Sequence, residues 1–150
     1  MASVISNIIN PIEVKYVTGN LTAAQINGMD VGHTPVLILP ASGVNTTYIV
    51  HAFLISSRRT VDFVGVASLW LTIGSLDSFG NSIVTPVSAA FLTSPVTGGG
   101  SIQVMLGDPT QGAYDYTTIV NQALYLTAGA PITGGNGTLK YHLWYSVEGV

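Results

Sequence analysis

The chain has 150 residues, enough for one domain with its own core, and no cysteine, which excludes disulfides and thiolate metal sites. Its four lysines and arginines and its net charge of −3 argue against a nucleic-acid partner, which would need a basic surface. Prolines and glycines interrupt the long uncharged runs before they reach the roughly 20 apolar residues of a membrane-spanning helix.

The first eleven residues, MASVISNIINP, differ in character from the rest of the chain. They include Ile5, Ile8 and Ile9 ahead of the first predicted strand. Such a segment either pairs at a sheet edge or docks on a neighbouring molecule, so we expect an N-terminal apolar arm over residues 1–11 and a folded domain over residues 12–150. The arm lacks the basic start and the cleavage site of a secretory signal, which predicts a protein made and kept in a cytoplasm.

From residue 12 onward the local pattern is almost entirely that of β-strands. Short apolar runs rich in valine, isoleucine, threonine and tyrosine recur between clusters of glycine, proline, asparagine and serine. One helical turn is predicted in LTAAQING, where Thr22 can cap the turn and Gly28 can end it. The predicted strands cover residues 12–17, 36–39, 47–56, 60–73, 82–87, 89–92, 101–106, 119–127 and 138–147.

Eight or nine strands without βαβ alternation predict an all-β protein, an antiparallel jelly-roll-like β-sandwich with a single domain. The connection over residues 107–118 is longer than a hairpin needs, and long crossings between sheets are what Greek-key topology requires. Shorter reversals are predicted at residues 77–81 and 97–101, where glycine supplies a positive φ.

Two of these strands lack an ordinary solvent face. In residues 138–147 one face reads as core, while the other carries His142 and Trp144 where charge is expected. In residues 60–73 neither face is a charged solvent face, since the second face has Asp62 as its single charge and carries Val64, Val66 and Trp70. An antiparallel sheet of a sandwich normally has one face exposed to solvent. We therefore expect copies of the chain to cover each other at the five residues His142, Trp144, Val64, Val66 and Trp70.

The scarcity of charge supports the same expectation. Charged residues make up 7% of the chain, against about 25% in an average soluble domain. A monomer of this mass would expose roughly 7,000 Å², which leaves about one charge per 650 Å². At about 25 cal/mol per Å², several hundred Å² of apolar surface would favour association strongly.

No pattern of catalytic or metal-ligating residues is present, so we expect neither an enzyme nor a bound cofactor or metal. The chain has no HExxH pair, GxSxG elbow, P-loop or GxGxxG sequence. His51 shares an alternating face with Ile49 and Phe53, which favours a core or interface histidine over a catalytic one. Asp108 and Asp115 flank one loop and are interpreted as turn residues in preference to calcium ligands.

Arg58 and Arg59 lie between two predicted strands and are followed by Asp62. Arginine is favoured at interfaces for its planar fork, so the pair could meet an acidic partner surface. The alternative is a solvated turn with a local ion pair that contributes little. The sequence favours neither interpretation.

The closing segment, residues 121–150, resembles the closing hairpin of small β-rich virion proteins of tailed bacteriophages. There an LYL strand leads through a TGGNGTL turn into a final alternating strand, and SPVTGGGSIQV at residues 94–104 is compatible with the same group. That group includes jelly-roll cement or decoration proteins of capsids and knob domains of fibres, commonly trimers. The resemblance implies a structural role and assigns no functional residues. The chain has no helical or repetitive shaft segment, which disfavours a whole fibre.

Our leading hypothesis is therefore a capsid cement or decoration protein, a homotrimeric knob that binds the major capsid protein in a virion assembled in the host cytoplasm. The candidate capsid contacts are Ile5, Ile8, Ile9, Arg58 and Arg59. The candidate trimer contacts are Val64, Val66, Trp70, His142 and Trp144. The alternative is a receptor-binding knob of a tail or head fibre that recognises a host saccharide.

Overall fold

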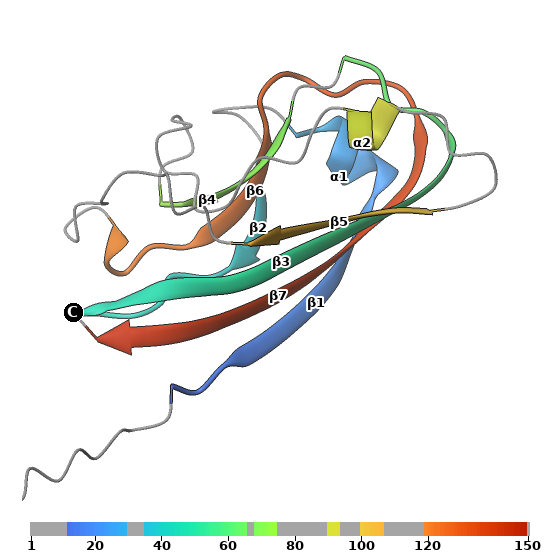
Figure 1. Ribbon diagram of the computed structural model, residues 1–150. Helices are drawn as coiled ribbons and strands as arrows, with labels where there is room; N and C mark the ends of the chain where they lie inside the picture. Colours follow the sequence, from blue (N-terminus) through green and yellow to red (C-terminus); the bar gives the residue numbers. More distant parts are fainter. Residues whose placement is uncertain are drawn as a thin grey trace, which may run out of the picture.

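The computed structural model describes residues 12–29, 35–65, 68–74, 90–93, 100–106 and 119–149. Two short helices and seven strands lie in these ranges, and Figure 1 labels them in chain order. They are β1 (Lys15–Thr22), α1 (Ala23–Asn27), β2 (Val36–Leu39), β3 (Thr46–Val61), β4 (Leu69–Ile73), α2 (Ala90–Thr93), β5 (Gly100–Leu106), β6 (Leu124–Ala128) and β7 (Asn136–Gly149).

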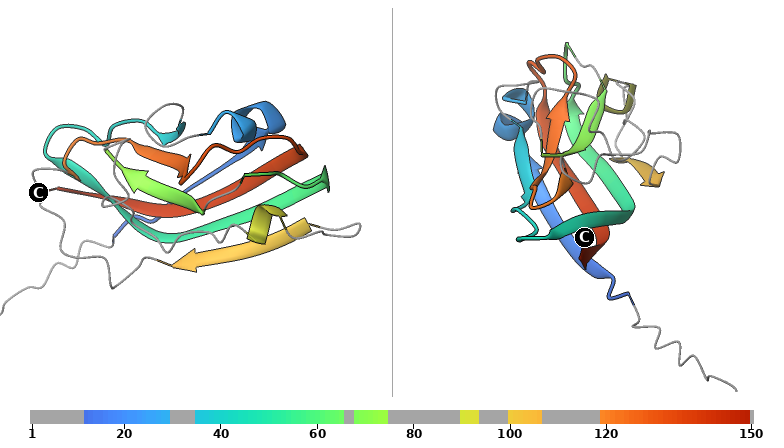
Figure 2. Two further views of the ribbon diagram at one scale, coloured as in Figure 1. Left: turned by 90° about the horizontal axis from the view of Figure 1, so that it is seen from above. Right: turned by 90° about the vertical axis from the view of Figure 1, so that its left-hand side faces the viewer.

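The strands pair in a nested order, β1 with β7, β2 with β6 and β3 with β5, and every pair is antiparallel. The pairs alternate between two sheets, with the order β1-β7-β3-β5 in one and β2-β6-β4 in the other. Figure 2 shows the shorter strands of the second sheet lying over one face of the longer strands. A ribbon folded back on itself and wrapped into two sheets is a jelly roll, which confirms the predicted fold class.

The hydrophobic core lies between the two sheets. Alternate residues of β7, namely Leu139, Tyr141 and Leu143, are buried, and Phe53 and Ile55 of β3 are buried beside them. One continuous cluster joins them to the inner face of the second sheet. That inner face consists of Leu69, Leu71, Ile73, Leu124, Leu126 and Ala128. The inward face predicted for residues 138–147 is confirmed.

Helix α1 begins and ends at the predicted residues. Thr22 accepts a hydrogen bond from the Gln25 backbone N–H, and the Gln25 side chain accepts one from the Thr22 backbone N–H, which completes a capping box. Gly28 follows the last helical residue, and its N–H donates to the Ala24 carbonyl. The buried Ile26 anchors the turn in the core.

Four predicted strands have different bounds or a different structure. The strands predicted at residues 47–56 and 60–73 are divided differently, since β3 runs without a break through Arg58 and Arg59 and β4 begins only at Leu69. The strand predicted at residues 89–92 is wrong in its described part, because residues 90–93 form helix α2. The strand predicted at residues 119–127 begins at Leu124, because Asn121 has a positive φ of 55° and breaks the extended backbone.

A β-bulge in β3 places His51 outside the core, which leaves an interface histidine as the remaining prediction for this residue. Val50 pairs with Tyr145 and Ala52 with Trp144, so His51 is an extra residue on β3. The bulge reverses the alternation, which places Phe53 in the core and leaves Ile49 exposed on the opposite face. His51 is exposed, and its Nε2 lies 3.0 Å from Ser146 Oγ.

Several predictions fall outside the described residues: the arm over residues 1–11, the strand at residues 82–87, the reversal at residues 77–81, the loop over residues 107–118 and the side chain of Val66. In the ranges that the structure describes, no helix has both the length and the apolar character needed to cross a membrane.

Candidate interaction surface

The four-stranded sheet has an outer face that points away from the core. Because side chains alternate along a strand, this face receives the residues between the buried ones of β7, together with their partners on β1 and β3. One cross-strand row consists of Tyr16, Trp144 and Ala52, and the next consists of Thr18, His142 and Leu54. Both rows run from the edge strand β1 across β7 to β3, and β7 and β3 each have a described neighbour on both sides.

Tyr16, His142 and Trp144 form a contiguous group that we call the outer aromatic cluster. The ring centroids of Tyr16 and Trp144 lie 5.1 Å apart, and those of His142 and Trp144 lie 6.1 Å apart with nearly parallel planes. Tyr16 and His142 also stack, and the Tyr16 hydroxyl is hydrogen-bonded to His142 Nδ1. These contacts hold the three rings against one another, so the sheet presents a preformed apolar surface.

The outer aromatic cluster is open to solvent in the single chain. Tyr16 is 51% exposed, while His142 and Trp144 are half-buried. The exposure continues towards the N-terminus, since Val14 and Ile12 are more than half exposed and alternate in register with Tyr16. Ile49 on β3 adds a further exposed aliphatic side chain to the same face.

Charge on this face is confined to its two ends. Lys140 lies on the same side of β7 two residues before His142, and Glu148 lies four residues after Trp144. The middle of the face therefore has the composition typical of the centre of a protein interface, with aromatic rings and no charged side chain from β1, β3 or β7.

The other predicted trimer contacts lie elsewhere. Trp70 is half-buried on the outer face of the three-stranded sheet, opposite Thr127. Thr72 and Thr127 on that face are buried, so parts of the chain already cover some of it. Val64 is 61% exposed and forms an isolated bridge with Thr133. The structure thus brings His142 and Trp144 together, and it places Trp70 on the opposite side of the sandwich.

The two arginines proposed as capsid contacts differ sharply. Arg58 is exposed on β3, whereas the Arg59 side chain is 2% exposed and points into the molecule. Arg59 Nε lies 2.8 Å from Asp62 Oδ1, and its Nη1 donates to Ser57 Oγ and to the Phe91 carbonyl. Arg59 therefore ties helix α2 to β3, and Arg58 is the arginine available to a partner.

Two tyrosines of the inner face are perturbed by burial. Burial raises the pKa of Tyr48, with a smaller contribution from Tyr145, and burial also raises the pKa of Tyr141. The Tyr48 hydroxyl donates to the Pro40 carbonyl at 2.6 Å, and its ring meets Tyr145 edge-on. These groups stabilise the interior and offer no reactive atom to solvent.

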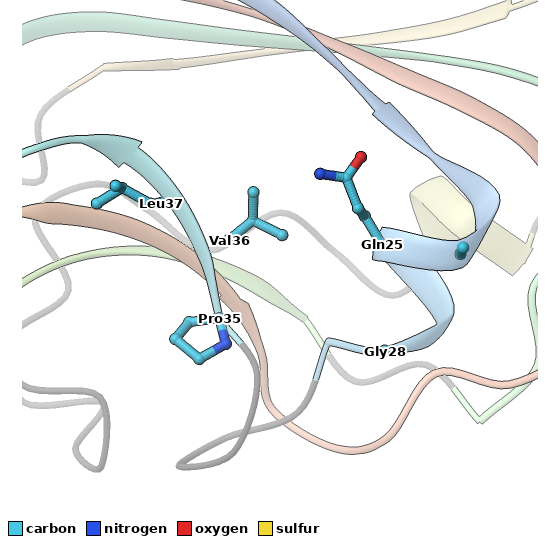
Figure 3. A pocket seen from close by; sticks show the side chains of 6 residues that line it. Gln25, Gly28, Pro35, Val36 and Leu37 are labelled. Atoms are coloured by element: carbon cyan, nitrogen blue, oxygen red, sulfur yellow. The ribbon is translucent and has the colours of Figure 1, made fainter.

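Two shallow hollows lie outside the outer aromatic cluster. The first, of about 490 Å³, lies between α1 and β2 (Figure 3) and is lined by Ala24, Gln25, Gly28, Pro35, Val36 and Leu37. The second, of about 400 Å³, is lined by Arg58, Arg59, Thr60, Asn136 and Gly137. Across the described ranges, no three histidine, aspartate or glutamate side chains gather closely enough to hold a metal ion.

The sequence alone does not identify Tyr16, Val14 and Ile12 as surface residues. They alternate along the strand predicted at residues 12–17, but this alternation does not indicate which side of the strand points to solvent. The partner strand that fixes the face lies more than a hundred residues later in the chain, at Tyr145 and Trp144. Only the pairing of β1 with β7 shows that Tyr16 stands beside Trp144.

Comparison with known proteins gives distant structural likenesses and no sequence family. No protein-family model matches the chain, and no curated protein matches it in sequence. The chain is similar to a chain of the cyanophage Pam1 capsid asymmetric unit, with 15% identity and a TM-score of 0.44 over 91% of this chain and 84% of that one. It is also similar to a chain of the semi-empty VLP of the giant freshwater prawn Macrobrachium rosenbergii nodavirus, with 12% identity and a TM-score of 0.31 over 94% of this chain and 96% of that one. At these values the likenesses carry no argument about function, and the fold rests on the strand pairing alone.

Proposed function

We propose that the protein is a structural component of a virion, a capsid cement or decoration protein that acts as a homotrimer. The observation that carries this proposal is the outer aromatic cluster, a set of rings in mutual contact on the outer face of the four-stranded sheet, with Tyr16 exposed and His142 and Trp144 half-buried. The chain has few charges that would keep this surface apart from its own copies. The resemblance of residues 121–150 to phage virion proteins supports the choice of a capsid over other assemblies.

The physical advantage of a trimer is multivalency. Three copies joined through His142 and Trp144 would present three weak capsid contacts at once, and the effective concentration of the second and third contacts makes the whole attachment strong. Arg58 is the exposed basic side chain available for an acidic patch of the major capsid protein. Ile5, Ile8 and Ile9 stay predicted contacts, and the site of action is the virion, assembled in the host cytoplasm.

The test is reconstitution on capsids stripped of their accessory proteins. The purified protein should bind these capsids saturably and should raise their resistance to heat and to chaotropes. The Arg58→Glu variant should bind more weakly and with less dependence on salt, because it removes the basic contact. A protein that leaves capsid stability unchanged, or that is a 15.6 kDa monomer at micromolar concentration, would overturn the proposal.

A receptor-binding knob is the second candidate. The observation that favours it is the exposure of the Tyr16 ring beside Trp144, because flat aromatic faces of this kind stack on sugar rings. A knob should bind host cells or host-surface polysaccharide and should leave capsid stability unaffected. Loss of cell binding in Tyr16→Ser with unchanged capsid behaviour would favour this second function.

A further inference from the structure

The hollow between α1 and β2 lies beside an edge of the three-stranded sheet. In the part of the chain that the structure describes, β2 pairs with β6 alone, so no described strand occupies the opposite edge of β2. Pro35, Val36 and Leu37 line the hollow from this edge, and Leu37 is 53% exposed. An extended segment that added to β2 would therefore have an apolar hollow beside it for alternate side chains.

The opposite wall of the hollow offers a hydrogen-bond donor. Gln25 Oε1 is occupied by the capping box, where it accepts from the Thr22 backbone and hydroxyl. Its Nε2 makes no hydrogen bond to any other described residue. In Figure 3 the side chains of Gln25 and Val36 point towards one another across the hollow. A backbone carbonyl of an inserted strand would meet this amide.

The best match for this site within the protein is its own N-terminal segment. Residues 1–11 contain no lysine, arginine, aspartate or glutamate, and the six residues that line the hollow contain none either. The segment carries Ile5, Ile8 and Ile9, which are the aliphatic side chains that an apolar hollow accepts. A charged peptide would lose hydration here without gaining a partner charge.

Geometry favours the segment of a second copy over the chain's own. β1 begins at Lys15 and ends at Thr22, directly before α1, so the start of β1 and the hollow lie at opposite ends of an eight-residue strand (Figure 1). The strand is about 25 Å long, and a segment returning to its own hollow would have to reverse at once and run back along it. Eleven extended residues reach at most about 38 Å, so a return of about 25 Å would leave few residues to pair with β2, whereas docking on a second copy requires no such return.

We propose that residues 1–11 of one copy dock in the hollow between α1 and β2 of a second copy and add a strand to the free edge of β2. This inference rests on the proposed homo-oligomer and not on the capsid. The arm then holds the oligomer together from outside, at a site separate from the outer aromatic cluster. In this arrangement Ile5, Ile8 and Ile9 contact a second subunit in place of the capsid contact predicted from the sequence, and Arg58 is the remaining proposed capsid contact.

The absence of native cysteine allows a direct test by disulfide trapping. Leu37→Cys would be mixed in turn with Ile5→Cys, Ile8→Cys and Ile9→Cys under mild oxidation, without capsids. At least one mixture should give a covalent dimer that reduction removes. The matched control replaces Leu37→Cys by Val44→Cys, another exposed aliphatic side chain on the turn after β2, and should give little dimer.

Variants with both cysteines in one chain show whether the arm in the hollow comes from the same copy or from a second copy. Ile8→Cys/Leu37→Cys should form covalent multimers if the arm docks on a neighbour, whereas an intramolecular disulfide in a single chain would overturn the inference. Trapping that occurs only after capsids are added, or no trapping by any of the three arm positions, would also overturn it. If the protein keeps its native oligomeric mass but no disulfide is trapped, the arm contact is rejected and the proposed function is unaffected. If the protein is a monomer, the arm contact and the proposed function are both rejected.

A second measurement does not depend on disulfide geometry. Leu37→Asp places a charge in the hollow, while Val44→Asp places one on an exposed turn nearby. The first should raise the dissociation constant of the oligomer at least tenfold, and so should deletion of residues 2–11. The second should change it less than twofold. Equal effects of the two aspartates would contradict docking in the hollow.

Discussion

Arg59 places a positive charge inside a protein that has few charged residues. The chain tolerates it because the guanidinium donates to Asp62, to Ser57 and to the Phe91 carbonyl, so the buried donors are matched by acceptors. A methionine of similar length would fill the space but would leave these acceptors without their donor. The arginine therefore stabilises the contact between β3 and α2 through polar geometry.

We predict that Arg59→Met lowers the free energy of unfolding by about 2 to 4 kcal/mol, as expected when one partner of a buried polar group is removed. Asp62 is partly exposed, which keeps the loss below that of a fully buried ion pair. Urea unfolding at neutral pH measures the difference. Arg58→Met is the matched control on the adjacent exposed residue and should change stability by less than about 0.5 kcal/mol. Equal losses in the two variants would refute the role of Arg59.

The raised pKa values of Tyr48 and Tyr141 predict a loss of stability in alkali. Below pH about 10 both phenols are neutral in the folded and unfolded states, so their contribution is fully present. As the pH rises past about 10, the unfolded chain loses these protons first, and stability falls until the pH passes the raised pKa values of the folded state.

Urea midpoints at pH about 9 and about 11 would measure this loss. The variant Tyr48→Phe/Tyr141→Phe should lose less stability between the two pH values than the parent does. Its stability at the lower pH should be reduced by about 1 kcal/mol, because the bond from Tyr48 to Pro40 is gone. An unchanged alkaline loss in the double variant would assign the effect to other groups.

At the scale of elements, the backbones of β3 and β7 approach each other tightly at Gly137. Gly137 has a φ of +125°, and a Cβ at this position would lie 2.2 Å from the Arg58 carbonyl oxygen and 2.8 Å from Arg59 Cα. Both obstacles are backbone atoms of β3, so neither can rotate away. Glycine is required here because the two strands approach too closely for any side chain.

We predict that Gly137→Ala lowers the free energy of unfolding by more than about 3 kcal/mol or abolishes the cooperative transition, because steric overlap adds to backbone strain. Gly134→Ala is the matched control. Gly134 also has a positive φ, of 62°, but the nearest atom to its Cβ is Val64 Cγ2 at 3.8 Å. Its loss should be about 1 kcal/mol, from strain alone. Thermal unfolding followed by circular dichroism would separate the two.

Elements with a local cause were predictable from the sequence. The capping box of α1 and the alternation of β7 are written in neighbouring residues, and both appear in the structure. The continuity of β3 was not predictable, since two adjacent arginines are typical of an exposed turn. Only the structure shows that the Arg59 guanidinium donates hydrogen bonds to the Asp62 carboxylate and the Phe91 carbonyl. The bulge at His51 likewise has no local pattern, and it reversed the assignment of Ile49.

At the scale of the whole molecule, the sequence predicted the sandwich and the exposed face of β7 but not how its candidate contacts are distributed. His142 and Trp144 share the outer face of one sheet, while Trp70 lies on the outer face of the other. In a homotrimer each copy contacts its two neighbours through different surfaces, so Trp70 and the pair His142 and Trp144 would belong to different sides of the interface. The sequence could not separate them, because the assignment of strands to sheets depends on pairing across the whole chain.

The outer aromatic cluster predicts which substitutions weaken self-association. Tyr16→Ser and Trp144→Ser should each raise the dissociation constant of the oligomer at least tenfold, because aromatic side chains at the centre of an interface carry much of its binding energy. The folded monomer should persist, since these rings lie outside the core. Sedimentation equilibrium measures the effect. Val44→Ser, at a residue 79% exposed in the turn before β3 and outside the cluster, should leave association unchanged, and a comparable effect there would contradict the assignment.

The nested pairing also determines when the four-stranded sheet can form during synthesis of the chain. β7 lies between β1 and β3, so the four-stranded sheet cannot close until residues 136–149 have left the ribosome. Until then the nascent chain holds β1 and β3 without the strand that separates them, and their apolar faces stay uncovered. Folding of this sheet therefore waits for its last strand and is slow for a chain of this size, because the contacts that complete it join residues far apart in sequence.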